Sequence, residues 1–178
     1  MIRISDSTEI RNIPGIENAA STTNAPLMGS TWGHGVTLRG AEGTGRFTWV
    51  SVGYFDTMAI RLLSGRDFSR KDTGASGRVA VVNQTFVRRY LSGVNPLGQT
   101  LRTHSEPGYP STVYEIVGTI ADTKYESLRG DTPPMVFAPA SQFPDPRPWT
   151  TIMMHSSLPA ATAAELMYRI LKIRPWAA

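Results

Sequence analysis

The chain has 178 residues, with 18 lysines and arginines against 14 aspartates and glutamates, and carries a formal net charge of +4. Its 16 glycines and 13 prolines exclude a coiled coil or a plain helical bundle, because both residue types favour turns and short elements. The absence of cysteine excludes disulfides and thiol nucleophiles, and basic residues that occur mostly singly or in pairs do not form a nucleic-acid-binding arm.

The first 52 residues are expected to form a short helix followed by strands. Asp6 and Glu9 have the spacing of a capping box, and Ile10 and Ile13 supply the apolar edge of that helix. Strands are predicted over residues 16–21, 36–39 and 47–52, separated by an irregular segment over 24–35 and a glycine-rich turn over 40–45.

The middle of the chain combines short helices with strands. Tyr54, Phe55 and Met58 have the spacing of one helical turn, and Gly65 marks a sharp turn after it. The apolar run over residues 79–82 predicts a strand that is covered on both faces. Asn83 is expected to cap the next helix, whose buried stripe is Phe86, Val87, Tyr90 and Leu91, before a turn over 95–98.

The last third of the chain adds strands and a final helix. Residues 114–121 alternate, which predicts a strand with Tyr114, Ile116 and Ile120 on one side. Prolines bracket residues 133–139, and a proline-flanked strand belongs at a sheet edge because proline cannot donate to a ladder. A strand over 150–155 and a helix that starts near Pro159 complete a mixed α+β pattern.

No residue pattern nominates an active site, a cofactor site or a metal site. His34, His104 and His155 have no partner at a metal-binding spacing and are expected at the surface or in loops. Asp67 and Asp72 flank two cations, so a solvated turn is favoured over a cation loop. Carboxylates that meet only in space stay possible, and a small stand-alone hydrolase is therefore the alternative function.

Five motifs in order resemble those of the MacB-like periplasmic core domain of ABC-transporter permeases of the MacB/FtsX class. The longest covers residues 50–68, and the others cover 79–83, 95–99, 114–118 and 134–139. The positions singled out in them are Gly53, Tyr54, Phe55, Gly65, Arg66, Asn83, Pro96 and Gly98. Their chemistry indicates scaffold roles, namely sharp turns, buried rings, a helix cap, and an arginine that pairs with a carboxylate or a backbone oxygen.

The resemblance implies a porter-like α/β half with an inserted sheet-rich subdomain. We place the insertion at residues 45–103, within a discontinuous subdomain made of 1–44 and 104–178. It also implies an extracytoplasmic, non-enzymatic domain of an inner-membrane permease, flanked by transmembrane helices that are absent from these 178 residues, so that the chain would be an excised domain or a gene fragment. The implied partners are a cytoplasmic ATPase, a periplasmic adaptor, an outer-membrane channel and a second copy, with no nucleic acid. No cofactor or metal is implied.

Overall fold

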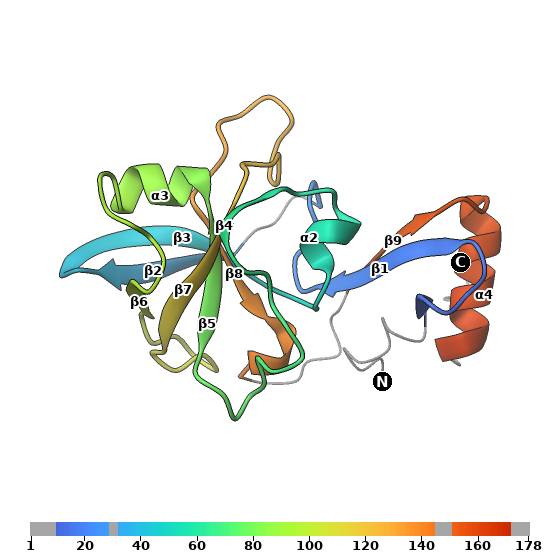
Figure 1. The fold of residues 1–178 in the computed structure, drawn as a ribbon, viewed down its shortest axis with the longest axis horizontal. Coiled ribbons are helices and arrows are strands. Elements are labelled where there is room, and N and C mark those ends of the chain that lie inside the picture. Colours follow the sequence, from blue (N-terminus) through green and yellow to red (C-terminus); the bar gives the residue numbers. More distant parts are fainter. Residues whose placement is uncertain (1–9, 29–31, 145–150, 172–178) are drawn as a thin grey trace.

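The computed structural model describes residues 10–28, 32–144 and 151–171. In chain order the elements are β1 (Ile16–Thr22), β2 (Trp32–Leu38), β3 (Ala41–Val50), α2 (Tyr54–Thr57), β4 (Leu62–Gly65), β5 (Val79–Asn83), α3 (Gln84–Tyr90), β6 (Thr100–Thr103), β7 (Val113–Ile120), β8 (Met135–Pro139), the 3₁₀ turn η1 (Ala140–Gln142), β9 (Thr151–Ser156) and α4 (Ala160–Leu171). The predicted mixed α+β class is confirmed, with a core dominated by one nine-stranded sheet (Figure 1).

Six of the strands form a closed ring. The sheet order runs β2–β6–β7–β5–β8–β3, and a further pairing of β2 with β3 joins its two ends. The parallel pairs are β3 with β8 and β5 with β7, whereas the other pairs in the ring are antiparallel. Closure leaves these strands with a hydrogen-bonded neighbour on each side, which is how a barrel removes exposed sheet edges.

The interior of the ring is one apolar cluster to which all six strands contribute. It includes Phe47 and Trp49 of β3, Leu101 of β6 and Tyr114 of β7, all nearly inaccessible to solvent. Phe86 of α3 joins the same cluster, so this helix packs its predicted apolar stripe onto the ring. Each such side chain contributes roughly 1.5–3 kcal/mol to stability through burial.

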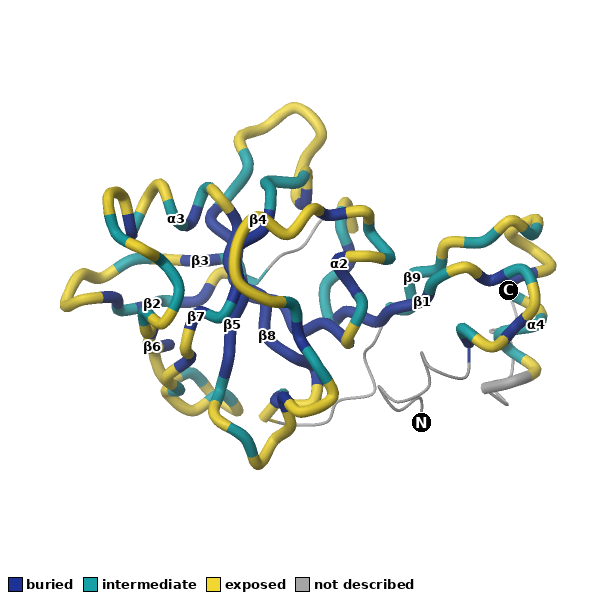
Figure 2. Tube along the Cα trace, viewed as in Figure 1, coloured by how far each residue is buried: buried dark blue, intermediate teal, exposed yellow. Residues whose placement is uncertain are grey.

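A second apolar cluster covers the outside of the ring. On β5 and β8 successive residues alternate between the two clusters, so that Val81 and Phe137 point outward and Val82 and Val136 point inward. The short helix α2 lies on this outer side (Figure 2). These strands are therefore buried on both faces, as the apolar run over residues 79–82 predicted.

β1, β9 and α4 extend away from the ring as a smaller lobe (Figure 1). β1 pairs with β9 along its length but meets β3 in the ladder only through Thr22 and Val50. Ile10 packs with Ala163 of α4 in a third apolar cluster, which brings the two ends of the described chain into one lobe. Asp6 and Glu9, the predicted capping box, lie outside the described residues.

The glycine-rich turn predicted over residues 40–45 is wrong. The chain reverses at Arg39 and Gly40, and β3 begins at Ala41 and includes the later glycines. A Cβ on Gly43 would lie 2.6 Å from the Tyr90 ring, so glycine is used here because a neighbouring side chain crosses the strand. Gly43, which suggested a turn, instead allows close packing against a side chain.

Two expectations about strands are also corrected. β8 is not an edge strand, because it lies between β3 and β5 and all five of its residues are buried. The sheet accommodates the prolines because Pro133 and Pro134 precede the strand and Pro139 is its last residue, opposite Val50. Ile120 does not share a face with Tyr114 and Ile116. The register shift of β7 against β5 near Val81 reverses the alternation, and Ile120 packs in the outer cluster.

The proposed subdomain boundaries fall at strands of the ring. The boundary between residues 44 and 45 lies within β3, and the one after residue 103 coincides with the end of β6. The division of the chain stays a prediction.

Within the described ranges, the structure contains no helix that is long and apolar enough to cross a membrane.

Candidate functional site

Gly53 begins α2 in the left-handed conformation, with φ +80°. A Cβ at this position would lie 2.6 Å from Nη2 of Arg11. That guanidinium donates to the carbonyl oxygens of Ala19 and Val52, each at 2.7 Å, and so joins the smaller lobe to the start of α2. Both the backbone angle and the contact with Arg11 favour glycine here.

Tyr54 and Phe55 fill the outer cluster beneath α2. The Tyr54 hydroxyl lies 3.2 Å from that of Tyr125, and burial, together with Tyr125, raises the pKa of Tyr54 far above its usual range. The edge of one ring faces the other in the pair Phe55 and Phe137, with centroids 5.2 Å apart. Both side chains pack as core residues, which is consistent with a scaffold role.

Gly65 lies where β4 approaches β7 closely. Its φ is +75°, and a Cβ there would lie 2.2 Å from the carbonyl oxygen of Val117. A Cβ on Gly118 would lie 2.4 Å from the carbonyl oxygen of Arg66. Two glycines on facing strands therefore allow the backbones to meet.

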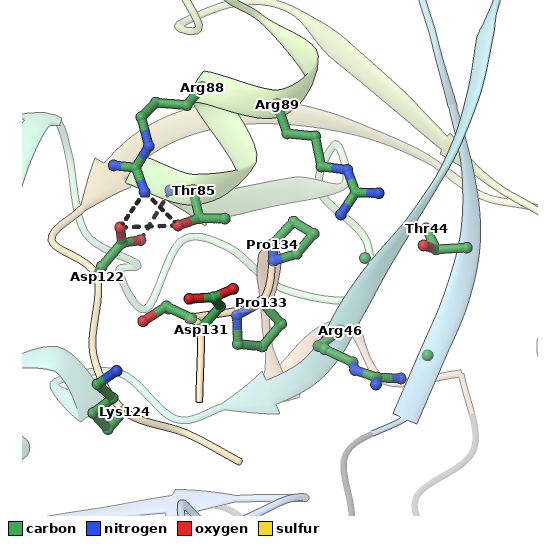
Figure 3. Close-up of a pocket in the computed structure, with 13 residues that line it drawn as sticks. Thr44, Arg46, Thr85, Arg88, Arg89, Asp122, Lys124, Asp131, Pro133 and Pro134 are labelled. Carbon is green, nitrogen blue, oxygen red and sulfur yellow. Dashed lines mark hydrogen bonds and ion pairs between the residues drawn. The ribbon is translucent and has the colours of Figure 1, made fainter. Parts of the chain in front are cut away.

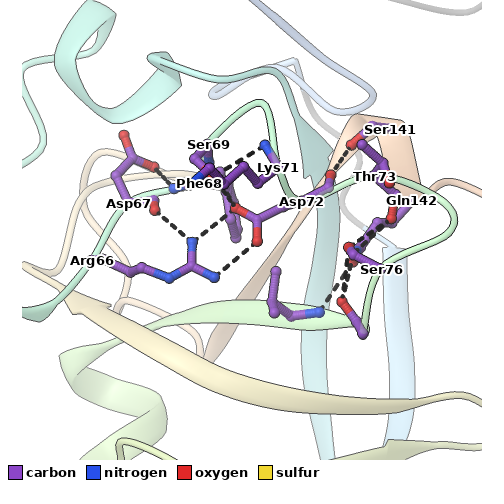
Figure 4. Close-up of polar contacts among 12 residues, drawn as sticks. Arg66, Asp67, Phe68, Ser69, Lys71, Asp72, Thr73, Ser76, Ser141 and Gln142 are labelled. Carbon is purple, nitrogen blue, oxygen red and sulfur yellow. Dashed lines mark hydrogen bonds and ion pairs between the residues drawn. The ribbon is translucent and has the colours of Figure 1, made fainter.

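Arg66 makes both of the contacts that the sequence left open, because it pairs with a carboxylate and also donates to the backbone carbonyl oxygen of Asp67 at 3.1 Å. Its two terminal nitrogens donate to the two oxygens of Asp72, each at 2.8 Å (Figure 4). Arg66 and the hydroxyl and amide of Ser69 hold the pKa of Asp72 below its usual range against the opposing effect of burial. The expected solvated turn over Asp67 and Asp72 is wrong for Asp72, which is buried because this pairing compensates its charge.

Gln142 anchors the other end of the same loop. Its amide nitrogen donates to the carbonyl oxygen of Gly77 at 2.8 Å and to that of Thr73 at 3.2 Å. Its side-chain oxygen accepts from the Val79 amide at 3.1 Å, and the Ser141 hydroxyl donates to the Asp72 carbonyl oxygen. The loop between β4 and β5 is therefore fastened to η1 at several points (Figure 4).

Asn83 caps α3 as predicted, and it also joins three elements. Its Oδ1 accepts from the backbone amides of Phe86 at 3.0 Å and Met135 at 2.9 Å. Its Nδ2 donates to the carbonyl oxygen of Pro133 at 2.9 Å. One buried amide side chain therefore fixes the end of β5, the start of α3 and the entry to β8.

The predicted turn over residues 95–98 is confirmed. The Gln99 amide donates to the Pro96 carbonyl oxygen at 3.2 Å, and the Gly98 amide donates to the Ile116 carbonyl oxygen at 2.9 Å. Gly98 has φ +80° with no atom within 4 Å of a Cβ built on it, so only its backbone angle favours glycine. That turn packs against β4, because Leu97 would contact a Cβ on Gly65 at 2.7 Å.

A groove of about 870 Å³ opens between α3, the middle of β3 and the segment that leads into β8 (Figure 3). We call it the basic groove. Its charged lining residues are Arg46, Arg88, Arg89, Lys124, Asp122 and Asp131. Cations outnumber carboxylates among these side chains, and the described residues that line the groove include no aromatic one.

Some of these cations are already paired. Arg88 donates to Oδ2 of Asp122 at 2.8 Å, and Thr85 donates to both oxygens of Asp122 through its amide and its hydroxyl, each at 2.9 Å. Arg46 lies 2.6 Å from the Glu126 carboxylate. The Asp122 carboxylate is thus occupied by hydrogen bonds and is poorly placed to act as a base.

Two cations of the basic groove have no carboxylate partner within the described ranges. The ammonium group of Lys124 donates to the carbonyl oxygen of Gly130 at 2.7 Å. The guanidinium of Arg89 lies over the ring of Tyr90, 5.6 Å from its centroid. Both side chains are exposed and keep donors available for an anionic group.

An apolar hollow of about 260 Å³ lies beside the basic groove. Its apolar lining comes from Leu63 of β4, Val87 of α3 and Pro96. We call it the apolar hollow. Arg88 lines both this hollow and the basic groove, so the two surfaces are continuous.

The histidines are only partly where the sequence placed them. His104 and His155 are exposed, as expected, but His34 is buried on β2. Its Nδ1 lies 2.9 Å from the Glu106 carboxylate, and its ring packs against Trp32. Among the residues that the structure describes, no group of three or more histidine or acidic side chains could hold a metal ion.

The basic groove and the apolar hollow were not found by sequence reasoning. Their residues come from β3, β4, α3, the turn after it and the segment before β8, which are far apart in the chain. Only the pair of arginines at 88 and 89 was visible as a signal, and that signal predicts no more than an exposed helix face.

The comparisons identify the relatives of this arrangement. The family described as the MacB-like periplasmic core domain matches residues 2–169. A comparison with curated proteins finds no match.

Three solved structures show the same fold. The periplasmic region of MacB from Actinobacillus actinomycetemcomitans is 16% identical, with a TM-score of 0.70 over 97% of this chain and 73% of that one. The extracellular domain of the noncanonic ABC-type transporter YknZ from Gram-positive bacteria is 12% identical, with a TM-score of 0.64 over 94% and 83%. A domain of a putative permease from Porphyromonas gingivalis is 14% identical, with a TM-score of 0.62 over 96% and 76%.

Proposed function

Since the chain belongs to the MacB-like periplasmic core domain family, it is an extracytoplasmic domain of an ABC-transporter permease, and we propose that it transmits ATP-driven conformational change to periplasmic partners or substrate during export. The family consists of transporter domains rather than enzymes, and its members belong to transporters that pair with a cytoplasmic ATPase. The match over residues 2–169 is the observation that carries the proposal.

The closed ring supports transmission of movement. A ring in which each strand is paired on both sides can be displaced as one body, because sliding any strand would break hydrogen bonds with two neighbours. The loop fastened by Arg66 and Gln142 and the three-way contact of Asn83 stiffen the same body. We therefore assign architectural roles to all eight positions singled out in the sequence.

The remaining parts of the proposal concern partners and organisation. In the whole permease we expect a dimer that works with a periplasmic adaptor protein and an outer-membrane channel. Residues 45–103 are kept as the inserted subdomain, and 1–44 with 104–178 as the porter-like one. The hydrolase alternative gains no support from Asp122, one of the two carboxylates that line the basic groove, because Thr85 and Arg88 already donate to it.

The test measures movement in the membrane-anchored full-length permease together with its ATPase. The 178-residue chain has no cysteine, so once any cysteines in the rest of the transporter are replaced, Ser92→Cys places one spin label on the exposed loop after α3 of each copy. We expect the distance between the two copies to differ between the ADP state and a trapped ATP state. Equal distances in the two states would contradict transmission, and a missing inter-copy signal would contradict the dimer.

A second label pair is the control. Ser92→Cys with Ala75→Cys puts both labels on exposed loops next to the ring within one copy. Because the ring is expected to move as one body, this distance should stay the same in both nucleotide states. A change in it would mean that the domain deforms rather than transmits.

A further inference from the structure

The surface formed by the basic groove and the apolar hollow combines two kinds of contact. Arg88 lines both, so a single bound segment can occupy the basic groove and the apolar hollow together. Arg89 and Lys124 lack carboxylate partners within the described ranges and add donors on the groove side (Figure 3). Arginine clusters of this kind recognise acidic motifs in proteins.

The hollow lies against an exposed strand. All four residues of β4 are exposed, and this strand pairs with β7 but with no other strand in the described part of the chain (Figure 2). Its two leucines are among the exposed apolar side chains of the described chain, with exposed fractions of 39% for Leu62 and 36% for Leu63. An unpaired edge with apolar side chains is a surface that an extended segment can cover.

We propose that the basic groove and the apolar hollow together bind an acidic, extended segment of a partner protein. An aliphatic side chain of the segment enters the hollow between Leu63, Val87 and Pro96, and neighbouring carboxylates reach Arg89 and Lys124. The binding proposal rests on the proposed function, because it describes the chemistry of a partner that such a domain would bind. Binding is measured on this chain alone, so its failure leaves the test of transmitted movement intact.

The chemistry of the surface favours a protein over other anions. Single-stranded nucleic acids bind through aromatic rings on which their bases stack, and within the described parts of the chain no aromatic side chain lines the groove or the hollow. Asp122 and Asp131 also interrupt the positive charge, which suits a segment that mixes carboxylates with neutral residues better than a uniform phosphate backbone.

The test uses the full 178-residue chain and fluorescein-labelled synthetic peptides. The probe alternates glutamate with leucine, and the control peptides alternate lysine with leucine and glutamate with serine. Fluorescence anisotropy should show that the first peptide binds at least about tenfold tighter than either control at low salt, and more weakly as salt is added. Equal binding of the three peptides, or no binding of the first at low salt, would overturn the proposal.

Matched variants locate the binding surface. Arg89→Glu with Lys124→Glu should weaken binding by at least about tenfold, whereas Arg70→Glu with Lys71→Glu, at exposed positions outside the groove, should change it less than about twofold. Leu63→Ser should weaken binding more than Val113→Ser, whose side chain is similarly exposed at 39%. Equal effects of variant and control would place the binding elsewhere. Tighter binding of an oligothymidylate than of the acidic peptide would overturn the choice of a protein segment as the ligand.

Discussion

Arg66 and Asp72 form a bidentate ion pair, in which each terminal nitrogen of the arginine donates to one oxygen of the carboxylate at 2.8 Å. The arginine is about half exposed, with a relative side-chain accessibility of 48%, whereas that of the aspartate is 6%. The pair fixes the loop between β4 and β5 by compensating a carboxylate that would otherwise be costly to bury.

Asp72→Asn should destabilise the chain at neutral pH. The pairing lowers the folded-state pKa of Asp72, so its contribution to stability is fully present above the unfolded pKa of about 3.9 and is lost as pH falls through the lower folded pKa. In urea unfolding at pH 7 we expect a loss of about 1–3 kcal/mol relative to wild type. The difference should shrink below about pH 4. A difference that does not vary with pH would contradict the role of the charge.

Asp67→Asn should show the opposite dependence on pH. Burial raises the folded-state pKa of Asp67, although a hydrogen bond from the Phe68 amide opposes the shift. The folded state then binds the proton more tightly than the unfolded state, so the contribution of Asp67 is present below the unfolded pKa and declines as pH rises through the folded pKa. The variant should gain stability relative to wild type between about pH 4 and pH 7 in the same urea series. A relative loss over that range would be the contrary result.

Gly65→Ala and Gly98→Ala distinguish two reasons why glycine is favoured, a left-handed backbone angle and a close approach of two strands. Both residues have positive φ, but only at Gly65 would a Cβ collide with a backbone oxygen, that of Val117 at 2.2 Å. We expect Gly98→Ala to cost about 1–2 kcal/mol for the left-handed angle alone. Gly65→Ala should cost more, by at least about 1 kcal/mol, because β4 must move away from β7. Equal losses in urea unfolding would mean that the strands separate without cost.

Asn83→Ala should be more damaging than the loss of an ordinary helix cap. It removes the acceptor for the Phe86 amide, at about 1 kcal/mol, and leaves the buried amide of Met135 without a partner, at about 1–3 kcal/mol. Asn83→Asp, compared with wild type below about pH 4, where its carboxyl group is protonated, keeps the acceptor of both bonds and can still donate to Pro133 through its hydroxyl. Thermal unfolding at that pH should therefore place it between Ala and wild type. An alanine variant no less stable than the aspartate variant would argue against the three-way contact.

The elements predicted most accurately are those that residues close together in the sequence determine. The strand over residues 79–82 and the helix after Asn83 follow from an apolar run, a capping side chain and a stripe at helical spacing. The family resemblance was likewise readable, because it depends on the order of several motifs along the chain.

What the sequence did not reveal depends on segments that meet only in space. Gly43 looked like a turn residue because nothing nearby shows that Tyr90 packs across it. The prolines beside β8 suggested an edge, since the strands that cover it, β3 and β5, lie far away in the sequence. The grouping of charged side chains in the basic groove could not be predicted for the same reason, because they come from three separate segments.

The pairing of β2 with β3 determines where the backbone can open to solvent. Each paired amide of a ring strand donates to the neighbour on one side, and no neighbour can separate without opening the ring, so we expect the exchange of these amides with deuterium to follow global unfolding. β9 pairs with β1 on a single side within the described chain, and its amides exchange through local opening that leaves the ring intact. A deuterium-exchange map therefore divides the molecule at Thr22 and Val50, where the smaller lobe meets the ring.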